Sequence, residues 1–193
     1  MRQFDMETSV PLDFLGELRR THMCGALRAT DVGKTVVLMG WVHKRRDHGG
    51  VIFIDLRDRD GIAQVVFHED AGSEMHLRAE LVRPEYVIAV EGKVEPRGPG
   101  MVNPNLATGE VEVVAQRIWI LNESRTPPFP VEDEVGVSED VRLKYRYVDL
   151  RRPRMQRNIV LRSKIAMAVR QALWNQGFLA VSYTHLDVYK RQV

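Results

Sequence analysis

The stretch from residue 51 to residue 67, VIFIDLRDRDGIAQVVF, decides the fold. Two runs rich in Val, Ile and Phe, at 51–58 and 62–67, have the composition and length of β-strands. Between them stands Asp60-Gly61, the strongest short-range hairpin signal in the chain. The stretch therefore predicts two consecutive antiparallel strands joined by a tight turn.

Upstream of this pair, residues 35–42 read TVVLMGWV, with apolar side chains on both sides of the chain. This pattern indicates a strand with both faces partly covered. Gly40 inside the run predicts a bulge or a sharp bend. Residues 47–50, Asp-His-Gly-Gly, form a turn signal before the next strand.

Downstream of the pair, the pattern predicts a short helix at 73–83 and strands at 86–94 and 110–121, with a loop rich in Pro, Gly and Asn between the two strands. Three strands, a helix and two more strands is the order of the OB-fold barrel. The predicted fold is therefore mainly β with some α, built on a five-stranded OB-fold barrel. A generic five-stranded sheet covered by one helix is the alternative.

Beyond the strands, residues 126–130 read TPPFP and an acidic run follows them. Proline fixes φ and removes hydrogen-bond donors, so this segment predicts a semi-rigid linker and a domain boundary. From residue 158 the apolar period changes to that of a helix, predicted at 158–176 with Gly177 after its end. A single amphipathic helix cannot bury its own apolar side, so it needs a partner surface.

Bulk composition restricts the classes of protein. The formal charge is only +2, but residues 142–164 hold nine Lys or Arg and one Asp, which is compatible with an anionic partner or with a solvated basic surface. The only cysteine, Cys24, excludes an internal disulfide and a thiolate zinc site, and the His spacing predicts no metal site. No apolar run approaches the roughly 20 residues of a membrane helix, so we expect a cytoplasmic protein without a membrane partner.

Several strings in order resemble the bacterial-type aspartyl-tRNA synthetases. They are THMCG at 21–25, GWVHKRRD at 40–47, FIDLRD at 53–58, TGEVEV at 108–113 and RLKYRYVDLRRP at 142–153. The resemblance runs from about residue 14 to Leu179. It implies a class II ligase that depends on ATP and Mg²⁺, with an OB barrel that binds the tRNA anticodon and a catalytic domain that forms a homodimer.

The resemblance also assigns the parts of the chain. It implies an N-terminal extension at 1–16, the anticodon-binding domain at 17–123, a hinge at 124–141 and a truncated start of the catalytic α+β domain at 142–179, which holds its first helix. The remaining residues, 180–193, depart from the family pattern, and we interpret them as translated adapter sequence. A genuine tail with a helix or strand of its own is the alternative.

Two predicted site residues lie in the deciding stretch. Phe53 matches the family's aromatic that stacks on the central anticodon base, and such stacking is worth about 1–3 kcal/mol per base. Gln64 matches the family's base-reading Gln, and its amide offers both a donor and an acceptor. The alternatives are a Phe packed in the barrel core and a Gln on a solvated strand face.

Two charged residues complete the predicted anticodon site. Arg46 matches an anticodon-contacting Arg of the family. Glu112 matches the acidic residue that reads the first anticodon base, and a carboxylate can accept from the N–H groups of guanine. Without the resemblance, the pattern favours Glu112 as a solvated strand residue.

His48 and Gly100 resemble the form of this enzyme that accepts both tRNA-Asp and tRNA-Asn. We therefore predict that the parent enzyme charges both tRNAs. The motivation is a His in the turn beside the anticodon pocket and a loop of small residues, 98–100, opposite it.

The catalytic groups of the family lie beyond this chain, so no catalytic residue is assigned. We expect this chain to bind an anticodon stem-loop weakly, to bind neither ATP nor Mg²⁺, and to be inactive in aspartylation. A free-standing OB module is the alternative function, and it has no need for the amphipathic helix at 158–176. The asparaginyl and lysyl relatives share the same plan and are a third choice.

Overall fold

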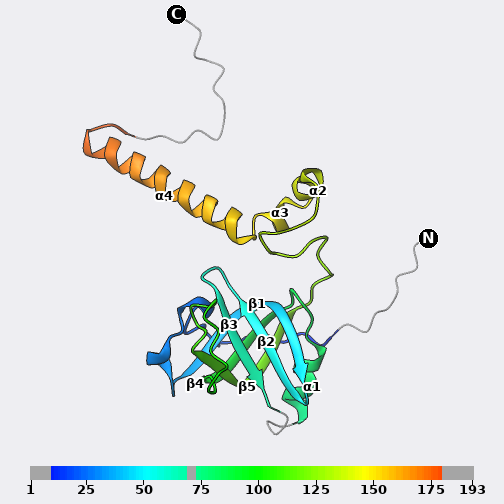
Figure 1. Cartoon of the computed structure of the whole chain (residues 1–193). Helices are drawn as coiled ribbons and strands as arrows, with labels where there is room; N and C mark the ends of the chain where they lie inside the picture. The colour runs from blue at the N-terminus through cyan, green and yellow to red at the C-terminus, as the bar shows by residue number, and fades with distance from the viewer. Residues whose placement is uncertain (1–9, 69–72, 180–193) are drawn as a thin grey trace, which may run out of the picture. The chain divides into compact units, whose positions relative to one another are not determined.

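A computed structural model describes residues 10–68 and 73–179, which fall into two compact units with the boundary in the sequence between Pro127 and Pro128 (Figure 1). The first unit holds the 3₁₀ turns η1 (Cys24–Ala26) and η2 (Ala29–Asp31), the strands β1 (Thr35–His48), β2 (Val51–Arg57), β3 (Ile62–Phe67), β4 (Val87–Pro96) and β5 (Val111–Asn122), and the helix α1 (Ser73–Leu81). The second holds α2 (Glu139–Lys144), α3 (Arg146–Asp149) and α4 (Pro153–Asn175).

The five strands of the first unit close into a ring in the order β1-β2-β3-β5-β4, with β4 pairing back onto β1. Every neighbouring pair is antiparallel except β3 and β5, where Val65 lies opposite Val113 and Val66 opposite Val114. The helix α1 connects β3 to β4 (Figure 1). The predicted five-stranded OB barrel is confirmed, and the generic open sheet is excluded because the ring leaves no edge strand.

The barrel interior follows from alternation along the strands. In β2, Ile52, Ile54 and Leu56 are fully buried, whereas Phe53 and Asp55 are only partly buried. Because successive side chains of a strand point to opposite faces, Phe53 lies on the outer surface. Each fully buried aliphatic side chain contributes about 1.5–3 kcal/mol to stability. The alternative of Phe53 as a core residue is therefore excluded.

Strand β1 continues six residues beyond the predicted end, to His48. Its first half pairs with β4 and its second half with β2, and the register shifts between Val42 and Lys44. We expected a bulge or a sharp bend at Gly40, but the irregularity lies further on, between Val42 and Lys44. Gly40 instead allows a close approach of two strands, since a Cβ there would stand 2.4 Å from the carbonyl oxygen of Arg57.

The predicted hairpin turn forms at Asp58–Gly61. The Asp58 carboxylate accepts from the backbone N–H of Asp60 at 2.8 Å and of Gly61 at 3.1 Å. Its second oxygen accepts from the N–H of Cys24 at 2.6 Å. An aspartate that bonds to the backbone two residues ahead is a common turn device. Here the same side chain also ties the turn to the segment that precedes β1.

The second unit has a small core of its own. Phe129, Val131 and Val148 are buried together, so part of the segment predicted as a linker packs against α3. The helix α4 begins at Pro153, five residues before the predicted start, because proline suits the first turn of a helix. The short helices α2 and α3 were not predicted. None of the helices in the described part of the chain is both long and apolar enough to cross a membrane.

Candidate nucleic-acid interface

Neighbouring strands bring the predicted site residues together on the outside of the barrel. Arg46 of β1 lies opposite Phe53 of β2, and Asp55 of β2 lies opposite Gln64 of β3. Phe53, Asp55 and Gln64 alternate with buried positions and therefore face outward, and Arg46 shares their face because it is paired directly with Phe53. The parallel pairing of β3 with β5 then places Glu112 beside Gln64.

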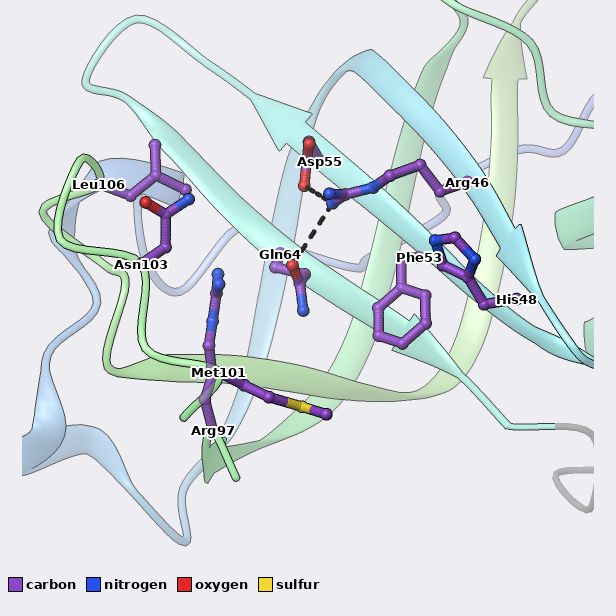
Figure 2. A pocket seen from close by; sticks show the side chains of 9 residues that line it. All are labelled: Arg46, His48, Phe53, Asp55, Gln64, Arg97, Met101, Asn103 and Leu106. Atoms are coloured by element: carbon purple, nitrogen blue, oxygen red, sulfur yellow. Dashed lines mark hydrogen bonds and ion pairs between the residues drawn. The ribbon is translucent and has the colours of Figure 1, made fainter. Parts of the chain in front are cut away.

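These side chains line an open cavity of about 350 Å³. Figure 2 shows the two sides of it, with Arg46, His48, Phe53 and Asp55 on one side and the loop after β4 on the other. The lining residues are Arg46, His48, Phe53, Asp55, Gln64, Arg97, Met101, Asn103 and Leu106. The cavity therefore combines an aromatic ring, two cations, a carboxylate and two amides.

A chain of polar contacts crosses the floor of the cavity. Arg46 Nη2 donates to Asp55 Oδ1 at 2.7 Å and to Gln64 Oε1 at 3.4 Å. Gln64 Nε2 then donates to Glu112 Oε2 at 2.8 Å. Of the four residues predicted to contact the anticodon, Arg46, Phe53 and Gln64 line the cavity. Glu112 does not line it and is joined to it through its hydrogen bond with Gln64.

Arg97 is a site residue that the sequence analysis missed. It follows β4 directly, and its Nε donates to the carbonyl oxygen of Val111 at 3.1 Å. Burial lowers the pKa of Arg97, while the carboxylates of Glu112 and Asp55 act in the opposite direction. Its buried Nη2 makes no hydrogen bond to the described part of the protein. The only sequence signal was a lone Arg beside a loop rich in Pro and Gly, which predicts nothing specific.

Of the two residues predicted to affect tRNA choice, His48 lines the cavity and Gly100 does not. The ring of His48 stands 6.0 Å from that of Phe53, between centroids, at an interplanar angle of 58°. His48 therefore borders the aromatic surface directly. Gly100 does not line the cavity, but its neighbour Met101 does. Gly100 has φ of +79°, a left-handed conformation that favours glycine and turns the loop at that point.

The described residues, 10–68 and 73–179, contain no group of three or more His, Cys, Asp or Glu side chains that could hold a metal ion. The one carboxylate that lines the cavity, Asp55, is bonded to Arg46, and the neighbouring Glu112 is bonded to Gln64. Magnesium prefers several free oxygen ligands, which this donor set does not offer. The cavity is suited to an organic ligand with stacking and hydrogen-bonding surfaces.

Comparison with known proteins gives matches in both units. Residues 36–121 match the OB-fold nucleic acid binding domain family, and residues 138–186 match the class II tRNA synthetases of the D, K and N types. The chain is 58% identical over 168 residues to an aspartate–tRNA(Asp/Asn) ligase of Geotalea uraniireducens. That match covers 87% of this chain and 28% of the relative, so the chain spans just over a quarter of the relative's length.

Solved structures agree with this placement. An asparaginyl-tRNA synthetase from Pyrococcus horikoshii, complexed with asparaginyl-adenylate, is 26% identical with a TM-score of 0.72, over 86% of this chain and 36% of that one. An aspartyl tRNA synthetase from Entamoeba histolytica shares the fold, with a TM-score of 0.80 at 19% identity, over 93% of this chain and 43% of that one. Over 87% of its length the chain is thus similar to aspartate–tRNA ligases, with the barrel matching the OB-fold nucleic acid binding domain family and the second unit matching the class II tRNA synthetases.

Proposed function

We propose that the cavity on the barrel binds the anticodon loop of a tRNA. One observation carries this proposal: Phe53, Arg46 and Gln64 meet in one cavity on the outer surface, with Glu112 bonded to Gln64. Unpaired bases of RNA are bound by stacking on aromatic rings and by hydrogen bonds to their edges. Phe53 supplies the stacking surface, Gln64 and Glu112 supply edge contacts, and Arg46 supplies positive charge.

Substitution of Phe53 tests the proposal. We expect Phe53→Ala to weaken binding of an anticodon stem-loop by about 1–3 kcal/mol, because a base loses its stacking partner. The measurement is fluorescence anisotropy with labelled stem-loops of tRNA-Asp and tRNA-Asn. Phe53→Tyr keeps the ring and serves as the control, and the melting temperature of each variant is measured alongside. Equal affinities for wild type and Phe53→Ala would sink the proposal.

The full-length enzyme is proposed to charge both tRNA-Asp and tRNA-Asn. The curated relative is named as a ligase for both, and His48 stands against the ring of Phe53. Met101, next to Gly100, reaches the other side of the same cavity. The test is aspartylation of the two tRNAs by the full-length parent. Comparable rates support the proposal, and a strong preference for tRNA-Asp contradicts it.

The catalytic role is also a proposal for the whole enzyme. We propose an ATP-dependent aspartate–tRNA ligase acting in the cytoplasm, with the groups that bind ATP and Mg²⁺ outside the described residues. Residues 17–123 would form its anticodon-binding domain, 124–141 its hinge and 142–179 the start of its catalytic domain. The tail at 180–193 lies outside the described residues. This chain by itself is expected to show no aspartate-dependent exchange of pyrophosphate into ATP, and detectable exchange would refute that expectation.

The alternative of a free-standing nucleic-acid-binding module is not favoured. The segment after the barrel distinguishes the two hypotheses, because a free-standing module does not need it. Residues 138–186 match a class II synthetase model, so that segment has a counterpart in the enzymes. The homodimer of the family is proposed for the full-length enzyme, with the exposed apolar side of α4 as part of its interface.

A further inference from the structure

The side-chain amide of Gln64 stands between two charged groups of opposite hydrogen-bonding character. Arg46 lies on the side of its oxygen and Glu112 on the side of its nitrogen. A guanidinium can only donate and a carboxylate can only accept. Rotating the amide by half a turn would set donor against donor at Arg46 and acceptor against acceptor at Glu112. The two neighbours therefore fix the amide in one orientation.

Asp55 acts on this orientation through Arg46. Its carboxylate lies 2.7 Å from Arg46 Nη2, the same nitrogen that donates to Gln64. Asp55 also lies directly opposite Gln64 in the pairing of β2 with β3. The ion pair keeps the guanidinium beside the Gln64 oxygen, where an unpaired Arg would sample many rotamers. Asp55 is therefore a positioning residue, distinct from the residues proposed to contact bases.

The fixed amide keeps one free donor and one free acceptor in a set order. Gln64 uses one of its two N–H groups on Glu112 and one of its two oxygen lone pairs on Arg46. All four RNA bases present a donor next to an acceptor on their Watson–Crick edge, so an amide that rotates freely could pair with any of them. At the ring nitrogen and the exocyclic group on the C4 side of a pyrimidine, or on the C6 side of a purine, the order is opposite in keto bases (uracil, guanine) and in amino bases (cytosine, adenine).

Phe53 supplies the second constraint that makes this order matter. It lies on the same outer face as Gln64, one diagonal step away across the paired strands β2 and β3. A base stacked on its ring presents its edge in a restricted direction. With both the base plane and the amide held, only one order of donor and acceptor matches.

We propose that Asp55 and Glu112 fix the orientation of the Gln64 amide. The fixed order of its donor and acceptor then lets the cavity discriminate keto from amino bases at the position stacked on Phe53. The inference rests on the proposed anticodon binding and adds the source of its selectivity. It predicts that selectivity can be lost without loss of stacking.

The test uses the full 193-residue chain and stem-loops that differ only by U or C at the middle anticodon position. These two bases share one ring and differ in the order of donor and acceptor at N3 and the substituent on C4. Wild type is expected to prefer one of them by about 10-fold or more, the discrimination typical of a well-formed bidentate pair. Glu112→Gln can both donate and accept, so it no longer holds the Gln64 nitrogen on its side, and the preference falls to about 3-fold or less. Asp55→Asn lowers it in the same direction.

Two control comparisons separate the orienting role of Glu112 from a general effect of its charge and from an effect that does not involve Gln64. Glu110→Gln removes an equal charge from an exposed residue two positions upstream, and it should leave the preference unchanged. In a Gln64→Met background, Glu112→Gln should have no further effect on the U/C preference, because the oriented group is gone. Gln64→Ala takes the place of Gln64→Met if that variant fails to fold.

Three results overturn the inference while leaving anticodon binding intact. They are equal binding of the U and C stem-loops by wild type, an unchanged preference in Glu112→Gln, and a Glu112→Gln effect confined to the first anticodon position. Absence of binding to every stem-loop overturns the proposed function and this inference with it.

Discussion

At the scale of single residues, Arg97 shows how binding and stability can oppose one another. Its guanidinium is partly withdrawn from water, which lowers its pKa, and its Nη2 lacks a partner in the described residues. A desolvated cation of this kind costs stability in the free protein. It also provides a charge-assisted donor for a phosphate or base oxygen, and such bonds are stronger than neutral ones.

We therefore expect Arg97→Gln to weaken stem-loop binding by about 1.5–3 kcal/mol while the melting temperature stays equal or rises. The salt dependence of binding should also become shallower, because one fewer cation displaces counter-ions. Titrations at several salt concentrations measure both effects. Arg117→Gln, at an exposed arginine of β5 that does not line the cavity, is the control. An equal loss in both variants would count against a site role for Arg97.

Cys24 gives a second prediction at this scale. Its side chain is fully buried, and burial followed by the nearby Asp58 carboxylate raises the pKa of the thiol well above its usual range. The thiolate is the reactive form, so the folded protein should resist alkylation at pH 8 and react only when unfolded. Mass spectrometry after iodoacetamide treatment, with and without urea, measures this. Rapid labelling without urea would contradict it.

The same shift has a consequence for stability. The folded state keeps the Cys24 thiol neutral. The contribution of this thiol to the free energy of unfolding is therefore fully present below the pKa of the unfolded state, about 8.5. It is lost progressively as the pH rises above that value, because the unfolded state releases the proton and the folded state does not. Urea unfolding at pH 7 and pH 9.5 should show a larger pH dependence in wild type than in Cys24→Ala.

At the scale of elements, an ion pair holds α3 to the start of α4. Arg152 Nη1 lies 2.7 Å from Asp149 Oδ1, and both side chains are almost completely buried. Arg152 Nη2 also donates to the carbonyl oxygen of Asp133 at 3.1 Å. The Asp133 carboxylate accepts from the backbone N–H of Arg154 at 2.7 Å, which caps the first turn of α4.

Asp149→Asn should destabilise the junction between α3 and α4, because it leaves the Arg152 cation buried without its partner charge. Breaking a buried pair by removing one partner costs about 3–5 kcal/mol. Hydrogen exchange of the backbone between Phe129 and Arg157 measures the local loss. Arg157→Gln removes only the ion pair between Arg157 and Asp133. The Arg157 side chain is 69% exposed, so this loss should cost less than about 1 kcal/mol of stability. Similar exchange rates in the two variants would contradict the expected ranking.

At the scale of the whole molecule, α4 presents apolar side chains that nothing in its own unit covers. Leu161 and Ile165, one turn apart, are 57% and 55% exposed, and Trp174 is 62% exposed. Apolar surface of this extent commonly marks a protein interface. The chain is therefore expected to self-associate through α4 at high concentration.

Replacing Leu161 and Ile165 by Gln should weaken that association by about tenfold or more, since burying one such side chain is worth about 1.5–3 kcal/mol. Sedimentation equilibrium over a range of concentrations measures the change. Gln171→Glu, an exposed polar position on the same helix, is the control. A wild-type chain that remains monomeric throughout the range would rule out self-association through this helix.

The amino-acid sequence by itself determined the strands, the helix between the third and fourth of them, and the turn at Asp60-Gly61. These features depend on periodicity and turn chemistry within a few residues, which local sequence carries. The resemblance of the sequence to a family also identified Arg46, Phe53, Gln64 and Glu112 as candidate site residues. It did not show whether Phe53 faced the core, and it missed Arg97 and Asp55 as parts of the site.

Only the tertiary structure decided which side chains meet. Gln64 and Glu112 are 48 residues apart and touch because β5 pairs in parallel with β3 to close the barrel. Arg97 reaches the same cavity because the chain leaves β4 beside that junction. Strand pairing between distant segments depends on the closure and register of the entire barrel, and no local pattern encodes it.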